Sequence, residues 1–161
     1  MSTFVGERMG TDGFTGAVRD GEAKCAALLA SPRCRMSALP DDMPLAGIYL
    51  FSEDGQTLYV GRTNRLRRRL QDHARNNQNQ ATFAFLLARE ETSKKAAYQT
   101  RGSRRDLMKD PDFRSAFDKA RERIRGMDVQ FIEETDPTRQ ALLEICAALR
   151  AEAAYNDFDN H

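Results

Sequence analysis

Two tyrosines, Tyr49 and Tyr59, lie in neighbouring β-favouring segments at a spacing that could bring both phenols to one site. The turn-forming sequence at 53–55 separates these segments, so the pattern predicts a β-hairpin with a three-residue loop. In that register Tyr49 lies opposite Tyr59, and Gly47 lies opposite Gly61. A phenol can exchange a proton or hold a phosphate oxygen, and a strand glycine allows another group to approach closely. A packed tyrosine pair with incidental glycines fits the same spacing.

An arginine-rich segment that follows the hairpin carries the next polar groups of interest. A cap at position 63 or 64 predicts a helix over about 65–76, with Leu66, Leu70 and His73 in one narrow stripe. Arg69 lies at the edge of that stripe, so Arg69 and His73 should both point toward the sheet. Three other arginines should point away from it: Arg65, Arg67 and Arg68.

Glu144 is the charged residue inside the apolar segment ALLEICAAL of the last predicted helix, which begins at Asp136-Pro137. A carboxylate in such surroundings is unfavourable unless it is paired or binds a metal ion. A solvent-facing glutamate on an amphipathic helix is the alternative.

The formal net charge of +1 conceals two concentrated basic clusters. Six arginines lie between residues 60 and 75 against a single acid, Asp72. The second cluster contains Lys94, Lys95, Arg101, Arg104 and Arg105. Such clusters favour a phosphate-rich partner, although a solvated helix face is the common alternative.

Composition restricts the class of protein further. The 161 residues suffice for one domain, and no apolar run is long enough to cross a membrane. Three widely spaced cysteines indicate a reducing, cytoplasmic setting and not a disulfide scaffold. With His73 and His161 as the only histidines, a Cys/His zinc site is not expected, so any metal ion should have oxygen ligands.

The elements predict an α/β (α+β) fold, with a small three-stranded antiparallel sheet and flanking helices. We expect a flexible tail over 1–21 and one domain over 22–161, with an insertion at about 77–127. Helices are expected at 21–31 and 111–125 and a strand at 129–133, whereas 81–89 fits either type.

Gly47-Ile48-Tyr49, followed after nine residues by Tyr59-Val60-Gly61, resembles the paired motifs that give the GIY-YIG nuclease family its name. The segment YVGRTNRLRRRLQDH is similar to the family's spacing from the second motif to an essential arginine and a frequent histidine. Glu144 on a late helix, with Tyr155-Asn156 following, extends the resemblance over most of the chain.

This resemblance implies a small, single-domain, bacterial-type endonuclease that hydrolyses DNA phosphodiester bonds with Mg²⁺ or Mn²⁺. Branched and single-stranded DNA both stay open as the preferred form. The implied metal ligand is Glu144, and the implied catalytic residues are Tyr49, Tyr59, Arg69, His73, Glu144 and Asn156. The implied substrate contacts are Gly47, Gly61, Arg62, Arg65, Arg67 and Arg68.

In the mechanism that the resemblance implies, Tyr49 activates the attacking water and Tyr59 positions the phosphate or the water, while Arg69 neutralises a phosphate oxygen. His73, acting through water, is an alternative base. Arg62 replaces a lysine that is frequent in relatives and keeps its charge, but arginine cannot act as a proton-transfer group.

Two other classes of function stay open: a nucleic-acid-binding module with an inactive nuclease site, and an interaction domain that binds an acidic protein. The nuclease hypothesis requires convergence of five groups: Tyr49, Tyr59, Arg69, His73 and Glu144. Asn156 should return to hydrogen-bond one of them. A glutamate on the far side of the sheet from the tyrosine hydroxyls would favour the binding module.

Overall fold

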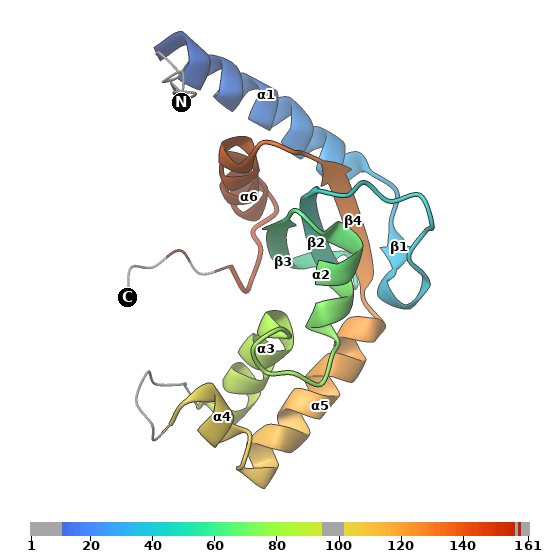
Figure 1. Ribbon diagram of the computed structural model, residues 1–161, viewed down its shortest axis with the longest axis vertical. Coiled ribbons are helices and arrows are strands. Elements are labelled where there is room, and N and C mark those ends of the chain that lie inside the picture. Colours follow the sequence, from blue (N-terminus) through green and yellow to red (C-terminus); the bar gives the residue numbers. More distant parts are fainter. Residues whose placement is uncertain (1–10, 95–101, 157, 159–161) are drawn as a thin grey trace, which may run out of the picture.

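The computed structural model describes residues 11–94, 102–156 and 158 (Figure 1). In chain order the elements are α1 (Thr11–Ala30), β1 (Cys34–Arg35), the 3₁₀ turn η1 (Met36–Ala38), β2 (Gly47–Glu53), β3 (Gln56–Thr63), α2 (Leu66–His73), α3 (Thr82–Thr92), α4 (Arg104–Leu107), α5 (Pro111–Arg125), β4 (Asp128–Glu133) and α6 (Pro137–Arg150). The mixed α/β class is therefore as predicted, and the ambiguous segment at 81–89 is helical.

The sheet has four antiparallel strands in the order β1-β4-β2-β3, and not the three that were predicted. The additional strand, β1, consists of Cys34 and Arg35, which pair with Val129 and Asp128 of β4. Two residues are too few to show the alternation by which a strand is recognised in a sequence. β3 lies at the edge next to the central strand β2.

The β2–β3 hairpin forms as expected, but its turn is tighter than predicted. The turn contains two residues, Asp54 and Gly55, whose φ angles of 51° and 80° are those of a two-residue hairpin turn. A β-bulge then leaves Leu58 of β3 unpaired between the partners of Phe51 and Ser52. Together the turn and the bulge shift the pairing by two residues.

The predicted cross-strand pairs are wrong because of this shift. Tyr49 lies opposite Gly61 instead of Tyr59, and Gly47 lies opposite Thr63 instead of Gly61. Side chains alternate with a period of two, so an even shift leaves both tyrosines on the predicted common face. Their ring centroids lie 6.4 Å apart, as diagonal neighbours.

The sheet is covered on both faces. Helices α1 and α6 lie on one side, whereas α2, α3 and α5 lie on the other (Figure 1). The first side buries Ile48, Leu50 and Val60 of the sheet against α1 and α6. Tyr49 and Phe51 of β2 face the other side.

The expected tail at 1–21 is corrected in part, because α1 begins at Thr11. Packing against α6 supports this extension: Ala17 is buried, and Asp20 and Glu22 pair with Arg139 and Arg150. Glycines at positions 13, 16 and 21 weaken the helical signal, and tertiary packing overrides that weak propensity. Residues 1–10 lie outside the described residues.

The segment expected as an insertion forms a helical layer around α3 and α5. One face of α5 is buried, through Phe113, Phe117, Ala120 and Ile124. Asp110 caps α5, which begins at Pro111 as predicted. The helix ends at Arg125, before Gly126.

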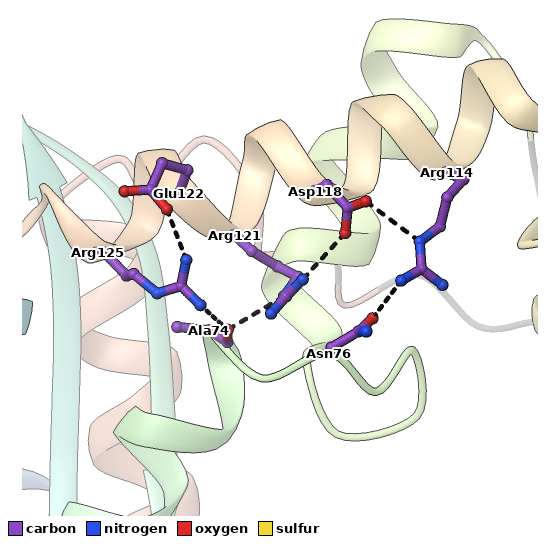
Figure 2. A network of polar contacts seen from close by, with 7 residues as sticks. All are labelled: Ala74, Asn76, Arg114, Asp118, Arg121, Glu122 and Arg125. Carbon is purple, nitrogen blue, oxygen red and sulfur yellow. Dashed lines mark hydrogen bonds and ion pairs between the residues drawn. The ribbon is translucent and has the colours of Figure 1, made fainter.

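Arginines of α5 hold the end of α2 (Figure 2). Arg121 and Arg125 both donate to the carbonyl oxygen of Ala74, at 3.1 Å each. Arg114 donates to the Asn76 side chain at 2.8 Å. These contacts satisfy a carbonyl at the helix end, where cations are electrostatically favourable. The inserted helix therefore positions the helix that carries Arg69 and His73.

No helix among the described residues is long and apolar enough to span a membrane. The three cysteines are free thiols. The cytoplasmic location stays a prediction.

Candidate active site

Tyr49 lies at the centre of the candidate site and is almost fully buried, with 1% of its surface exposed. Its hydroxyl is 2.7 Å from Nε2 of His73. A Cβ atom at Gly61 would lie 2.3 Å from the Tyr49 hydroxyl oxygen, so only glycine leaves room for the phenol. Burial raises the pKa of Tyr49 above its ordinary value, and the charge of Arg69 opposes that shift.

His73 is a fully buried partner of Tyr49 at the end of α2. The backbone N–H of Phe83 donates to Nδ1 at 3.4 Å, which places the ring proton on Nε2. Nε2–H then donates to the Tyr49 oxygen, leaving the phenol proton free for another acceptor. Burial, followed by the charge of Arg69, lowers the pKa of His73 well below 6.5, so the ring is neutral at neutral pH.

Arg69 is held by two groups that follow α2. Its guanidinium donates to the carbonyl oxygen of Gln80 at 2.9 Å and to Oγ1 of Thr82 at 2.6 Å. Its charge lowers the pKa of both Tyr49 and Tyr59 against the larger effect of burial. Arg69 is therefore fixed in orientation while its charge acts at the two phenols.

Tyr59 lies beside Tyr49 and is less deeply buried. Its ring stacks on Phe83, with centroids 4.9 Å apart and planes 14° from parallel. Burial raises the pKa of Tyr59, the charge of Arg69 lowers it, and that of Glu144 raises it. Of the two phenols, Tyr59 is the more accessible to a ligand.

Three residues of this site were not found from the sequence: Gln80, Thr82 and Phe83. They bind Arg69, His73 and Tyr59 through the contacts given above. In the sequence Thr82 and Phe83 belong to an apolar run without a distinguishing motif, and a carbonyl acceptor such as that of Gln80 carries no side-chain signal. The start of the expected insertion is therefore part of the site.

Glu144 lies beside the edge strand, where its Oε2 accepts from Nε of Arg62 at 2.9 Å. The Glu144 side chain is 22% exposed. Burial raises its pKa above 4.5, although Arg62 opposes the shift. A half-buried carboxylate with one cationic neighbour fits Mg²⁺ or Mn²⁺, which need few protein oxygens and keep several waters.

Helix α6 itself packs against the aliphatic side of the sheet, through Leu143 and Ala147. The charge of Glu144 raises the pKa of both tyrosines, and β3, which carries Tyr59, is an edge strand. The convergence of all five groups on one pocket stays a prediction. Tyr49, Tyr59 and His73 contact one another directly, and the charge of Arg69 acts on all three.

Asn156 returns to the hairpin, but it does not orient any of these side chains. Its Oδ1 accepts from the Val60 N–H and its Nδ2 donates to the Val60 carbonyl, both at 2.7 Å. Val60 lies between Tyr59 and Gly61, so Asn156 braces the strand that carries these residues. The expected side-chain hydrogen bond is replaced by a backbone one.

The remaining expected substrate contacts differ in what they touch. A Cβ at Gly47 would lie 2.0 Å from the Ile132 carbonyl, so this glycine, like Gly61, makes room for the protein itself and not for a ligand. Arg62 is paired with Glu144, and Arg67 donates to the Pro40 carbonyl. Arg65 and Arg68 are exposed, as predicted.

The fold and this cluster define an α+β domain with a buried polar site on one face of a β-hairpin. The GIY-YIG catalytic domain family matches residues 45–156, most of the chain, and the chain therefore belongs to the GIY-YIG family, a family of nuclease domains. Comparisons with curated proteins and with solved structures give no match. The recognised resemblance is thus confirmed, and the matched span includes the helices at 77–127.

Proposed function

We propose that this chain is a divalent-metal-dependent endonuclease that hydrolyses phosphodiester bonds of DNA. The observation that carries the proposal is the joint placement of Tyr49, Tyr59, Arg69 and His73 on one face, with the charge of Glu144 acting on both phenols. Family membership supports the same reaction class.

Glu144 is the residue that would hold Mg²⁺ or Mn²⁺, whose charge, when the ion is bound, stabilises the leaving oxygen. Arg69 is oriented to neutralise a non-bridging phosphate oxygen, because Gln80 and Thr82 fix its guanidinium before any substrate arrives. Such preorganised charge is effective in a site from which much of the water is excluded.

Because the two tyrosines are buried to different extents, we propose roles that differ from those expected, in which Tyr49 activated the water. Tyr59 is the phenol that can contact the attacking water, since Tyr49 is almost fully enclosed. Tyr49 accepts from His73, which leaves its own proton for another acceptor within the site. His73 is then a positioning residue, because both of its ring nitrogens are engaged within the protein.

One observation favours the binding module with an inactive site: Arg62 occupies the carboxylate that should hold the metal ion. The Arg62 side chain is 45% exposed, so a divalent ion can displace it at small cost. The active and inactive hypotheses therefore differ in a measurable property, metal-dependent cleavage.

The deciding experiment measures nicking and cutting of plasmid, linear and branched DNA with Mg²⁺, with Mn²⁺ and with chelator. Glu144→Gln should lower the cleavage rate by at least about 10³-fold while DNA affinity in chelator stays unchanged, since a charge essential to the chemistry is removed. Glu152→Gln, at an exposed position just after α6, is the matched control and should cleave normally. Equal rates for wild type and Glu144→Gln would overturn the proposal.

A further inference from the structure

A cavity of about 450 Å³ lies between the loop that precedes β2 and the first turns of α2. Its apolar wall consists of Met43, Pro44 and Leu45, while Leu66 closes its base. The Leu66 N–H donates to the Leu45 carbonyl at 2.8 Å, which fixes the loop against the helix. The volume is within the usual range of ligand pockets.

Leu45 makes this wall unusual, because 77% of its surface is exposed. An apolar side chain so placed beside a cavity offers a surface on which a flat or apolar group can be buried. Apolar burial is favourable in proportion to the area covered, so even one covered leucine contributes to affinity.

The opposite wall is cationic. Arg65, Arg67 and Arg68 line it, and among the residues that line the cavity there is no carboxylate. Arg67 donates to a backbone carbonyl, and the nearest acid to Arg68 is Asp72 at 4.0 Å. The excess of positive charge is complementary to phosphate groups.

The cavity is close to the candidate active site along the chain. Leu45 precedes Tyr49 by four residues, which limits their Cα separation to about 14 Å. Arg68 is followed directly by Arg69 on the same helix. Gln71 also lines the cavity, and its amide can both donate to and accept from the edge of a base.

We propose that this cavity binds one unpaired nucleotide of the DNA substrate. The base lies on Met43, Pro44 and Leu45, and the adjoining phosphates contact the arginines. This inference rests on the proposed function and names the substrate class: DNA with a single-stranded or displaced nucleotide near the cleaved bond. A paired base would first have to leave its stack, which opposes binding of a perfect duplex.

The test measures fluorescence anisotropy in chelator with three labelled oligonucleotides. One is a perfect duplex, the second carries one unpaired thymidine, and the third carries an abasic residue at the same unpaired position. Wild type should bind the thymidine-containing DNA about tenfold more tightly than the abasic one, the lower part of the range for base stacking on proteins. The abasic arm separates contact with the base from contact with a distorted backbone.

Leu45→Ser should remove this preference while leaving affinity for the perfect duplex unchanged. Leu149→Ser is the matched control, because Leu149 is also exposed, at 69%, but lies on α6 outside the cavity lining. Both positions are at the surface, so thermal unfolding should show that both variants stay folded.

Equal affinity for the thymidine and abasic DNA overturns the inference, as does a preference that survives Leu45→Ser. In either case metal-dependent cleavage, measured separately, can still support the proposed nuclease. If instead the protein binds no DNA, and an acidic peptide binds in a manner sensitive to Leu45→Ser, the inference and the proposed function both fail.

Discussion

The two faces of the same hairpin differ in chemistry. On one face Ile48, Leu50 and Val60 pack against α1 and α6, and every one of these contacts is aliphatic on the strand side. Along the two strands, Tyr49 and Tyr59 alternate with these aliphatic residues and therefore face the other side. There they contact His73 and other aromatic rings. The same two strands thus contribute one face to an aliphatic core and the other to a polar, aromatic site.

The difference indicates how the domain tolerates a costly polar site. A phenol and an imidazole buried together are unfavourable unless their hydrogen bonds are satisfied, and His73 satisfies one with Tyr49 and one with Phe83. The aliphatic face carries no such constraint and supplies ordinary burial free energy. Substitutions on one face should therefore affect chemistry, and those on the other should affect stability.

Among the substitutions that compare the two faces, Arg69→Lys on the polar face should have the largest effect. Lysine keeps the charge but cannot donate simultaneously to Gln80 and Thr82 while facing a phosphate, so kcat should fall about 10²- to 10³-fold. Arg75→Lys, close by after the end of α2 and paired with Asp72, should have almost no effect on rate. A normal kcat for Arg69→Lys would contradict the assigned role.

Leu50→Ala should produce the opposite pattern on the aliphatic face. The free energy of unfolding should fall by about 2–5 kcal/mol, because a fully buried leucine leaves a cavity. Cleavage per folded molecule should stay within about twofold of wild type. Urea denaturation and active-site-normalised rates measure the two quantities, and a large rate loss without destabilisation would break the distinction between the faces.

Phe83→Leu tests whether the helical layer contributes to the site or only to the core. We expect about a tenfold loss in kcat, since Tyr59 loses its stacking partner while the backbone N–H at this position can still donate to His73. Phe85→Leu is the matched control: Phe85 is equally buried on α3 but packs on Phe113, with ring centroids 5.0 Å apart. Comparable rates for the two variants would assign Phe83 to the core alone.

The smallest effect is a pH dependence of stability. Because the pKa of His73 is lowered on folding, the unfolded chain binds a proton more readily, and stability should fall as pH decreases below about 6.5. The slope from this one group should not exceed about 1.4 kcal/mol per pH unit. Denaturation between pH 7.5 and 5.5 checks this decline, which should be absent in His73→Asn. A decline of equal slope in both proteins would assign it to other groups.

The sequence predicted the hairpin, the basic helix and the common face of the two tyrosines, because each depends on local periodicity. The pairing register was wrong, since a turn of two residues and an unpaired Leu58 cannot be distinguished from a three-residue loop by composition. Because the pairing was shifted by two residues, the tyrosines stayed on the predicted face of the sheet, but their cross-strand partners changed.

Long-range contacts were the main feature that the sequence did not reveal. Thr82 and Phe83 enter the site because a loop and a helix fold back onto α2, and this depends on packing against α5. Asn156 was expected to hydrogen-bond one of the site side chains, but it bonds the backbone of Val60, which no side-chain motif indicates.

The hydrogen bonds that Tyr155 and Asn156 form with β3 also affect self-association of the protein. An edge strand exposes N–H and C=O groups that can pair with another chain. Asn156 occupies both groups of Val60, and the Tyr155 N–H occupies the Leu58 carbonyl at 2.9 Å. Removing residues from 155 onward would open this edge to strand pairing between molecules, so the segment that braces the tyrosine strand also protects it from aggregation.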